Sequence, residues 1–230
     1  MCLCAYAALL LVAKSMALSI AHGCFGLALG IWRVVPRCGS WREALQLAWE
    51  RRRELLVCIL IANAPDIDFF FGILTGNLNR FHQAGTHTLA GILAMALGLW
   101  LYGKYALKNR PVLAFWFVFL LLAGHLVIDV FTADTRRPIG IMLAWPFSER
   151  YWHSAVSLFP AAAKQNAMDI FCLRNLKNAG WEFFVSFPFV AAALLMKIHK
   201  QGLSLGGAGL PPGRSERDEV VPSPKIHPRD

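Results

Sequence analysis

Five apolar runs set the main constraint on how this 230-residue chain can fold. They span residues 5–32, 55–74, 88–102, 112–131 and 183–198. A helix needs about 20 mainly apolar residues to cross a bilayer, and these runs approach that length. Hydrophobic residues make up 57% of the sequence and charged residues only 16%, unlike the balance of a soluble domain. The sequence therefore predicts an all-α protein, a polytopic membrane helix bundle with four or five transmembrane helices.

Basic residues lie mainly between the apolar runs. The net charge is +9, but the Lys and Arg residues form no single stripe, so a nucleic-acid partner is not expected. Residues 33–53 hold six arginines and residues 104–110 hold three basic residues, whereas residues 75–85 hold only Arg80. The positive-inside rule then predicts a cytoplasmic C-terminus, an outside N-terminus and an outside segment 132–182, although that segment also carries six basic residues.

The two ends of the chain differ from its middle. Residues 201–230 are rich in Gly, Pro, Ser and mixed charge, which predicts a disordered cytoplasmic tail after a membrane-embedded domain of residues 1–200. Residues 1–13 resemble a signal-peptide core but lack a basic segment before it, so an uncleaved N-terminus is favoured. A start at Met16 is the alternative. The six cysteines form no CxxC pair and are interpreted as small buried hydrophobes.

Two acids interrupt the second apolar run, in the stretch IANAPDIDFFFG. Pro65 breaks the helix there because it lacks an N–H, and Asp66 and Asp68 follow it directly. Carboxylates and broken backbone at membrane depth are tolerated only against protein or a wet cavity. This pattern favours a functional site, with a helix cap involving Asn63 as the structural alternative.

Two histidines precede the third run, in the stretch FHQAGTHTLAG. His82 and His87 are five residues apart and would not share one face of a continuous helix. Gly85 permits a tight turn and Thr86 is a good N-cap, so His87 is expected to open the third helix while His82 precedes it in a loop. Both rings can then converge on one metal. Hydrogen-bonded interface histidines are the alternative.

His125 and Asp129 close the fourth run four residues apart, on one face of a helix. This spacing suits shared metal ligation or a carboxylate that orients an imidazole, and a neutralised buried pair is the alternative. In the predicted topology, four segments deliver their side chains to the outer side of the membrane, including the first run if its helix begins near Met16. The side chains are His22, Asp66 and Asp68, His82 and His87, and His125 and Asp129.

Imidazole and carboxylate ligands without thiolate suit zinc, and manganese less well. Their number exceeds the three protein ligands of a typical mononuclear catalytic zinc, so two or three ions are expected. Such clusters activate water and hold the oxygens of a displacement at phosphorus. Arg136 and Arg137 could contact a phosphate, or they could be loop charges that face solvent or lipid headgroups.

Together these motifs resemble the YdjM-like family of membrane-bound, metal-dependent hydrolases. The resemblance covers residues 21–152 and lies in AHG, PDID, the HxxxTH pattern, and an HxxxD pattern followed by DTRRPIGIMLAWPFS. It implies a relation to the zinc-dependent phospholipase C and P1 nuclease group, whose helical fold holds three zinc ions with His and Asp residues. The resemblance therefore implies phosphoester hydrolysis. Gln83 is a departure, since members of the family often have Arg there.

We expect a membrane-bound hydrolase that cleaves a phosphoester of a lipid or lipid-linked substrate at the outer face of a bacterial inner membrane. Asp68 is the expected catalytic base or a further ligand, and Arg136, Arg137 and Thr86 are expected to contact the substrate. A metal ion or proton transporter could use the same residues as a transient path, and a non-catalytic membrane partner protein is a third possibility. The expected metal ligands are His22, Asp66, His82, His87, His125 and Asp129.

Overall fold

The computed structural model describes residues 20–68, 85–107, 110–134, 139–163 and 172–198. Within these residues the protein has six α-helices and no strand, which confirms the predicted all-α class for this part of the chain. Three short 3-10 turns, η2 (Ala64–Ile67), η3 (Gly85–His87) and η4 (Pro111–Leu113), lie between helices. The α-helices are α2 (Ile20–Val34), α3 (Trp41–Glu50), α4 (Arg52–Ala62), α6 (Leu89–Tyr105), α7 (Phe115–Val130) and α8 (Leu173–Leu195).

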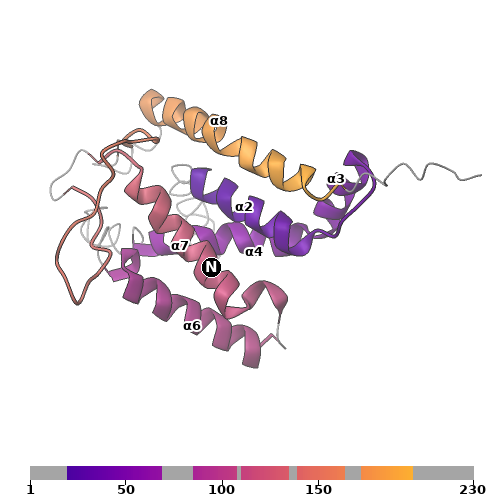
Figure 1. Ribbon diagram of the computed structural model, residues 1–230, viewed down its shortest axis with the longest axis horizontal. Coiled ribbons are helices and arrows are strands. Elements are labelled where there is room, and N and C mark those ends of the chain that lie inside the picture. Colours follow the sequence, from indigo (N-terminus) through magenta and orange to yellow (C-terminus); the bar gives the residue numbers. More distant parts are fainter. Residues whose placement is uncertain (1–19, 69–84, 108–109, 135–138, 164–171, 199–230) are drawn as a thin grey trace, which may run out of the picture. The chain divides into compact units, whose positions relative to one another are not determined.

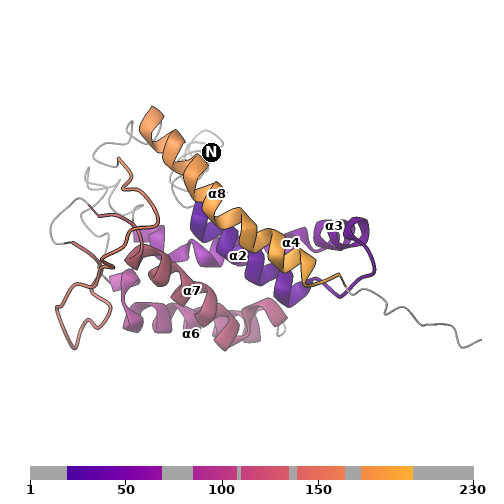
Figure 2. The same cartoon turned by 45° about the horizontal axis from the view of Figure 1, so that its top comes forward.

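Helix α2 packs against α4 and α8 and also contacts α7, while α6 packs along α7 (Figures 1 and 2). One apolar core lies among α4, α6 and α7, around Ile92, Val118 and Leu121. A second core joins α2 to α8 around Ile31 and Val190. The contacts described below bring the N-terminal ends of α2 and α6 together with the C-terminal ends of α4 and α7, so polar side chains from four helix ends can meet.

Only α8, among the described helices, is long and apolar enough to cross a membrane by length and composition. Helices α2, α6 and α7 are apolar but shorter, so the predicted four or five spans are not confirmed. Helix α8 also begins at Leu173, ten residues before the predicted start of the fifth run at residue 183. The prediction placed residues 173–182 in the outside segment 132–182, before the fifth apolar run.

These polar side chains of α8 are buried and hydrogen-bonded. The amide of Asn175 exchanges two hydrogen bonds with the backbone of Ala163, at 2.8 and 2.7 Å, and Asn178 donates to the carbonyl of Ala161 at 3.0 Å. Glu182 accepts a hydrogen bond from the backbone N–H of Ala21 at 3.3 Å. The polar face of α8 therefore fastens the preceding segment and the first turn of α2, which explains why a helix forms where hydropathy is low.

Gly26 allows α2 and α4 to approach closely. A Cβ atom at this position would lie 2.7 Å from the carbonyl oxygen of Cys58 and 2.8 Å from the Cβ of Ala62. Both of these atoms belong to the backbone or to a side chain that cannot rotate away. The absence of a side chain at residue 26 therefore fixes the distance between the two helices that carry His22 and the turn of Asp66.

We expect Gly26→Ala to destabilise the protein by about 1–3 kcal/mol, because the added methyl group overlaps α4. Thermal unfolding of the purified protein in detergent measures this change. Gly98→Ala is the matched control, since its Cβ would meet nothing within 4 Å and alanine favours the helix by about 1 kcal/mol. Equal unfolding temperatures for the two variants would contradict the close α2–α4 contact.

Candidate metal centre

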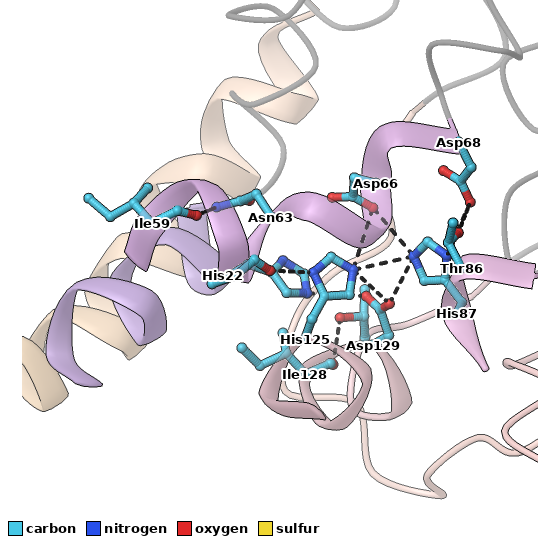
Figure 3. Close-up of polar contacts among 12 residues, drawn as sticks. His22, Ile59, Asn63, Asp66, Asp68, Thr86, His87, His125, Ile128 and Asp129 are labelled. Carbon is cyan, nitrogen blue, oxygen red and sulfur yellow. Dashed lines mark hydrogen bonds and ion pairs between the residues drawn. The ribbon is translucent and has the colours of Figure 1, made fainter. Parts of the chain in front are cut away.

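Five of the six expected metal ligands come together in the structure, as Figure 3 shows. They come from the first turn of α2, from η2, from the end of η3, and from two successive turns of α7. The sixth expected ligand, His82, lies outside the described residues, as do Arg136 and Arg137. We call the five residues the His/Asp cluster: His22, Asp66, His87, His125 and Asp129.

Four donor atoms of this cluster lie close together: Nε2 of His87, Nε2 of His125, and one oxygen each of Asp66 and Asp129. The Nε2 atoms of His87 and His125 are 3.3 Å apart, and each lies 3.5 Å from Oδ1 of Asp66. Oδ2 of Asp129 lies 3.5 Å from the first nitrogen and 3.3 Å from the second. Zinc bound at about 2.0–2.1 Å from four ligands requires ligand-to-ligand distances of about 3.3–3.4 Å. The two nitrogens form a triangle with either oxygen, and each triangle has about the spacing of three ligands of one zinc ion.

The break at Pro65 helps to orient His125. In a continuous helix the N–H of Asp66 would bond to the carbonyl of Ala62, but here it donates to the carbonyl of Asn63 at 3.2 Å. The carbonyl of Ala62 instead lies 2.8 Å from Nδ1 of His125. Because a carbonyl only accepts hydrogen bonds, Nδ1 carries the proton and Nε2 presents its lone pair to the cluster. The predicted interruption of the helix at Pro65 is confirmed.

Asp68 lies at the opposite edge of the His87 ring from the four converging atoms. Its Oδ2 is 3.1 Å from Nδ1 of His87 and accepts a hydrogen bond from the hydroxyl of Thr86, also at 3.1 Å. A carboxylate on the second nitrogen of a ligating histidine fixes the ring and its tautomer. This contact is that of an orienting group, and the expected role of Asp68 as a base stays a prediction.

The surroundings of His87 favour positive charge. Burial opposes protonation of the ring, but hydrogen bonds to Asp66 and Asp68 and the charge of Asp129 raise the pKa of His87 to about 9. The same carboxylates would stabilise a divalent ion at Nε2, and such an ion would displace the proton.

Thr86 does not cap the third helix as predicted, and His87 does not open it. Helix α6 begins at Leu89, and its N-cap is Thr88, whose hydroxyl accepts from the N–H of Gly91 at 2.9 Å. The hydroxyl of Thr86 is engaged by Asp68, and residues 85–87 form a 3-10 turn. The cap therefore lies two residues later. A contact between Thr86 and a substrate stays a prediction.

The other carboxylate oxygen of Asp129, Oδ1, lies beside His22. Oδ1 of Asp129 is 3.3 Å from Nε2 of His22, and the ring of His22 stacks on that of His125 with centroids 3.9 Å apart. Both ring nitrogens of His22 and Oδ2 of Asp129 are buried and, among the described residues, make no hydrogen bond. The two side chains are thus close but poorly aligned for hydrogen bonding, and each buried group left unpaired costs about 1–3 kcal/mol. Bound ions on both sides of Asp129 would satisfy its Oδ2 and Nε2 of His22.

A sequence comparison shows to which family the chain belongs. The model of the YdjM inner membrane protein family matches residues 16–202.

The chain belongs to the YdjM inner membrane protein family.

The match includes the whole His/Asp cluster and also His82, and it supports the expected location in the inner membrane. No curated protein and no solved structure matches the chain. The implied relation to phospholipase C and P1 nuclease therefore rests on the resemblance of the motifs, and the outward orientation of the cluster stays a prediction.

Sequence reasoning missed two groups beside the cluster. Glu182 is only 6% exposed and bonds the residue directly before His22, which anchors the start of α2. In the sequence, Glu182 is an acidic residue directly before the fifth apolar run, and the prediction placed it in the outside segment. The contact of the Ala62 carbonyl with His125 could not be predicted from the sequence, because every residue has a carbonyl and only the fold directs this one to His125.

We expect His87→Ala and Asp129→Ala each to lower bound zinc strongly, although the two residues lie 42 positions apart in the sequence. Each variant removes one of the converging donor atoms. Metal analysis of the purified, folded protein measures the effect. His153→Gln is the control, since the described contact of His153 is to the carbonyl of Ser154. Unchanged zinc in both cluster variants would show that these side chains only pair with each other.

Asp68→Asn distinguishes an orienting group from a base. An amide accepts the hydrogen bond of His87 but lacks the negative charge, so we expect zinc affinity to fall about 10- to 100-fold. Competition with a chelator of known affinity measures this change. A base acting on bound water would instead leave the affinity intact and cost about 10²- to 10⁴-fold in turnover. Unchanged zinc affinity would therefore contradict the orienting role.

Proposed function

We propose that this member of the YdjM family is a membrane-bound, zinc-dependent hydrolase that cleaves a phosphoester of a lipid or lipid-linked substrate. The observation that carries the proposal is the carboxylate of Asp129, which presents one oxygen to His22 and the other to His87 and His125. A carboxylate shared between two sets of donors is the arrangement that holds two ions close together. Two neighbouring divalent ions acidify water and stabilise the oxygens of a phosphoryl group.

The histidines and the carboxylates of the cluster would have different roles in holding the metal. His87 and His125 are fully buried, and their second nitrogens are held by Asp68 and by the carbonyl of Ala62, so their ligating atoms are fixed in place. Asp66 and Asp129 have side chains that are 18% and 17% exposed, so the carboxylates lie nearer the surface than the two imidazoles. Nitrogens fixed deep in the protein, with carboxylates nearer the surface, suit a retained metal that a substrate can approach.

Three carboxylates also limit which substrate can approach. Asp66, Asp68 and Asp129 surround His87 and would repel an anionic phosphoester. Bound divalent ions reverse the sign of this field, so binding of the substrate should depend on the metal. The cluster lies at the ends of apolar helices in an inner membrane protein, and this supports a substrate that is itself amphiphilic.

The test is release of phosphate or headgroup from a panel of phospholipids and lipid-linked phosphates by purified protein loaded with zinc. We expect release that stops with a chelator, returns with zinc, and falls at least about 100-fold in Asp129→Asn. Glu149→Gln, a change at an exposed acid outside the cluster, should leave release unchanged.

Flux of metal ions and protons into proteoliposomes is measured with the same preparations. Metal-dependent flux without any product would contradict the hydrolase proposal and favour a transporter. Release that persists in Asp129→Asn would show that the cluster is not the site of hydrolysis.

A further inference from the structure

Helix α3 is amphipathic, and its apolar stripe is exposed. Trp41, Leu45 and Trp49 follow one another at intervals of four residues, so they share a face of the helix, and they are 44%, 47% and 69% exposed. Ala44 is the only residue of α3 that is buried against the protein. An apolar stripe of this kind in a membrane protein belongs at the boundary between headgroups and acyl chains.

A groove of about 580 Å³ lies beside this stripe, between α2, α3 and α4. Its floor includes Leu27, Leu55 and Ile59, and Trp49 forms part of its wall. Arg52 and Arg53, at the start of α4, line the same groove. The α3–α4 groove, as we call it, thus combines an apolar floor with two guanidinium groups.

The two arginines carry charge that the described residues do not neutralise. Arg51 pairs with Glu54 at 3.5 Å, but neither Arg52 nor Arg53 forms an ion pair within the described ranges. The guanidinium of Arg52 lies 5.0 Å from the ring centre of Trp49 and donates to its backbone carbonyl at 3.0 Å. Its position is therefore fixed at the edge of the groove, while most of its donors have no partner among the described residues.

The groove is separate from the metal centre. Helix α2 begins beside the His/Asp cluster and runs toward α3, and its 15 residues correspond to a length of about 22 Å. Helix α4 runs the opposite way, from Arg52 to the turn of Asp66. The α3–α4 groove and the His/Asp cluster therefore lie toward opposite ends of α2 and α4.

We propose that the α3–α4 groove binds an anionic phospholipid of the membrane, with an acyl chain on the apolar floor and the phosphate between Arg52 and Arg53. Guanidinium groups bind phosphate through paired hydrogen bonds, and tryptophan is enriched at the depth of the lipid headgroups. A soluble anion would not explain the exposed stripe of Trp41, Leu45 and Trp49, whereas a lipid accounts for both the charge and the apolar surface. This site is independent of the hydrolase proposal.

Quenching of Trp49 by brominated lipid tests the site. The full-length protein is placed in phosphatidylcholine vesicles that contain either brominated phosphatidylglycerol or an equal fraction of brominated phosphatidylcholine with unlabelled phosphatidylglycerol. Subtracting the signal of Trp49→Phe isolates this tryptophan from the other seven. We expect the anionic lipid to quench Trp49 more strongly. The relative affinity should fall about five-fold for each arginine changed to Gln.

Paired variants make the outcome specific. Arg52→Gln with Arg53→Gln should abolish the preference, Lys at both positions should largely keep it, and Arg37→Gln with Arg42→Gln, which lie outside the groove, should not change it. Equal quenching by the two lipids would overturn the proposal, because it would mean that bulk lipid covers the face. Absence of quenching by either lipid would also overturn it and would indicate that protein or water covers Trp49.

Discussion

Burying several carboxylates in one place is the constraint on which the rest of this helical unit depends. Asp66, Asp68 and Asp129 lie around two fully buried histidines, and such a concentration of negative charge is costly unless cations compensate it. A second proton on the His87 ring would supply some of that charge, and divalent ions would supply more. Since no single helix can present five ligands to one point, the ends of α2, α4, α6 and α7 must meet, and the close contact at Gly26 holds two of them at the necessary distance.

The parts of the site that sequence could predict are those set by local geometry. His125 and Asp129 share a face because four residues make about one helical turn, and Pro65 interrupts its helix because it lacks an N–H. The side of His87 on which Asp68 lies could not be predicted, because it depends on how η2 packs against η3. The choice of Thr88 over Thr86 as helix cap has the same origin, since a tertiary partner engages the earlier hydroxyl. The start of α8 was missed because its polar residues find partners only in the folded chain.

The lengths of α6 and α7 bear on the depth of the His/Asp cluster and so on the substrate we propose. Helix α7 has 16 residues and α6 has 17, which correspond to about 24 and 26 Å, less than the hydrocarbon thickness of about 30 Å. A cluster at the ends of helices this short would lie near the depth of lipid headgroups instead of well beyond them. Phosphoester bonds of lipids lie at that depth, so an amphiphilic substrate could reach the carboxylates with its chains still in the bilayer.

The two ends of the α2–α4 pair carry opposite charges, and this asymmetry bears on how the protein is oriented in the membrane. Six arginines lie in residues 33–53 at the α3 end, while the acids of η2 lie at the other. Basic segments are retained on the cytoplasmic side, which would place the α3–α4 groove at the anionic inner leaflet and the cluster at the outer face. The arginines that set the topology would then also be the ones that hold a lipid, and the acids at the far end would be balanced by metal ions together with the histidines beside them.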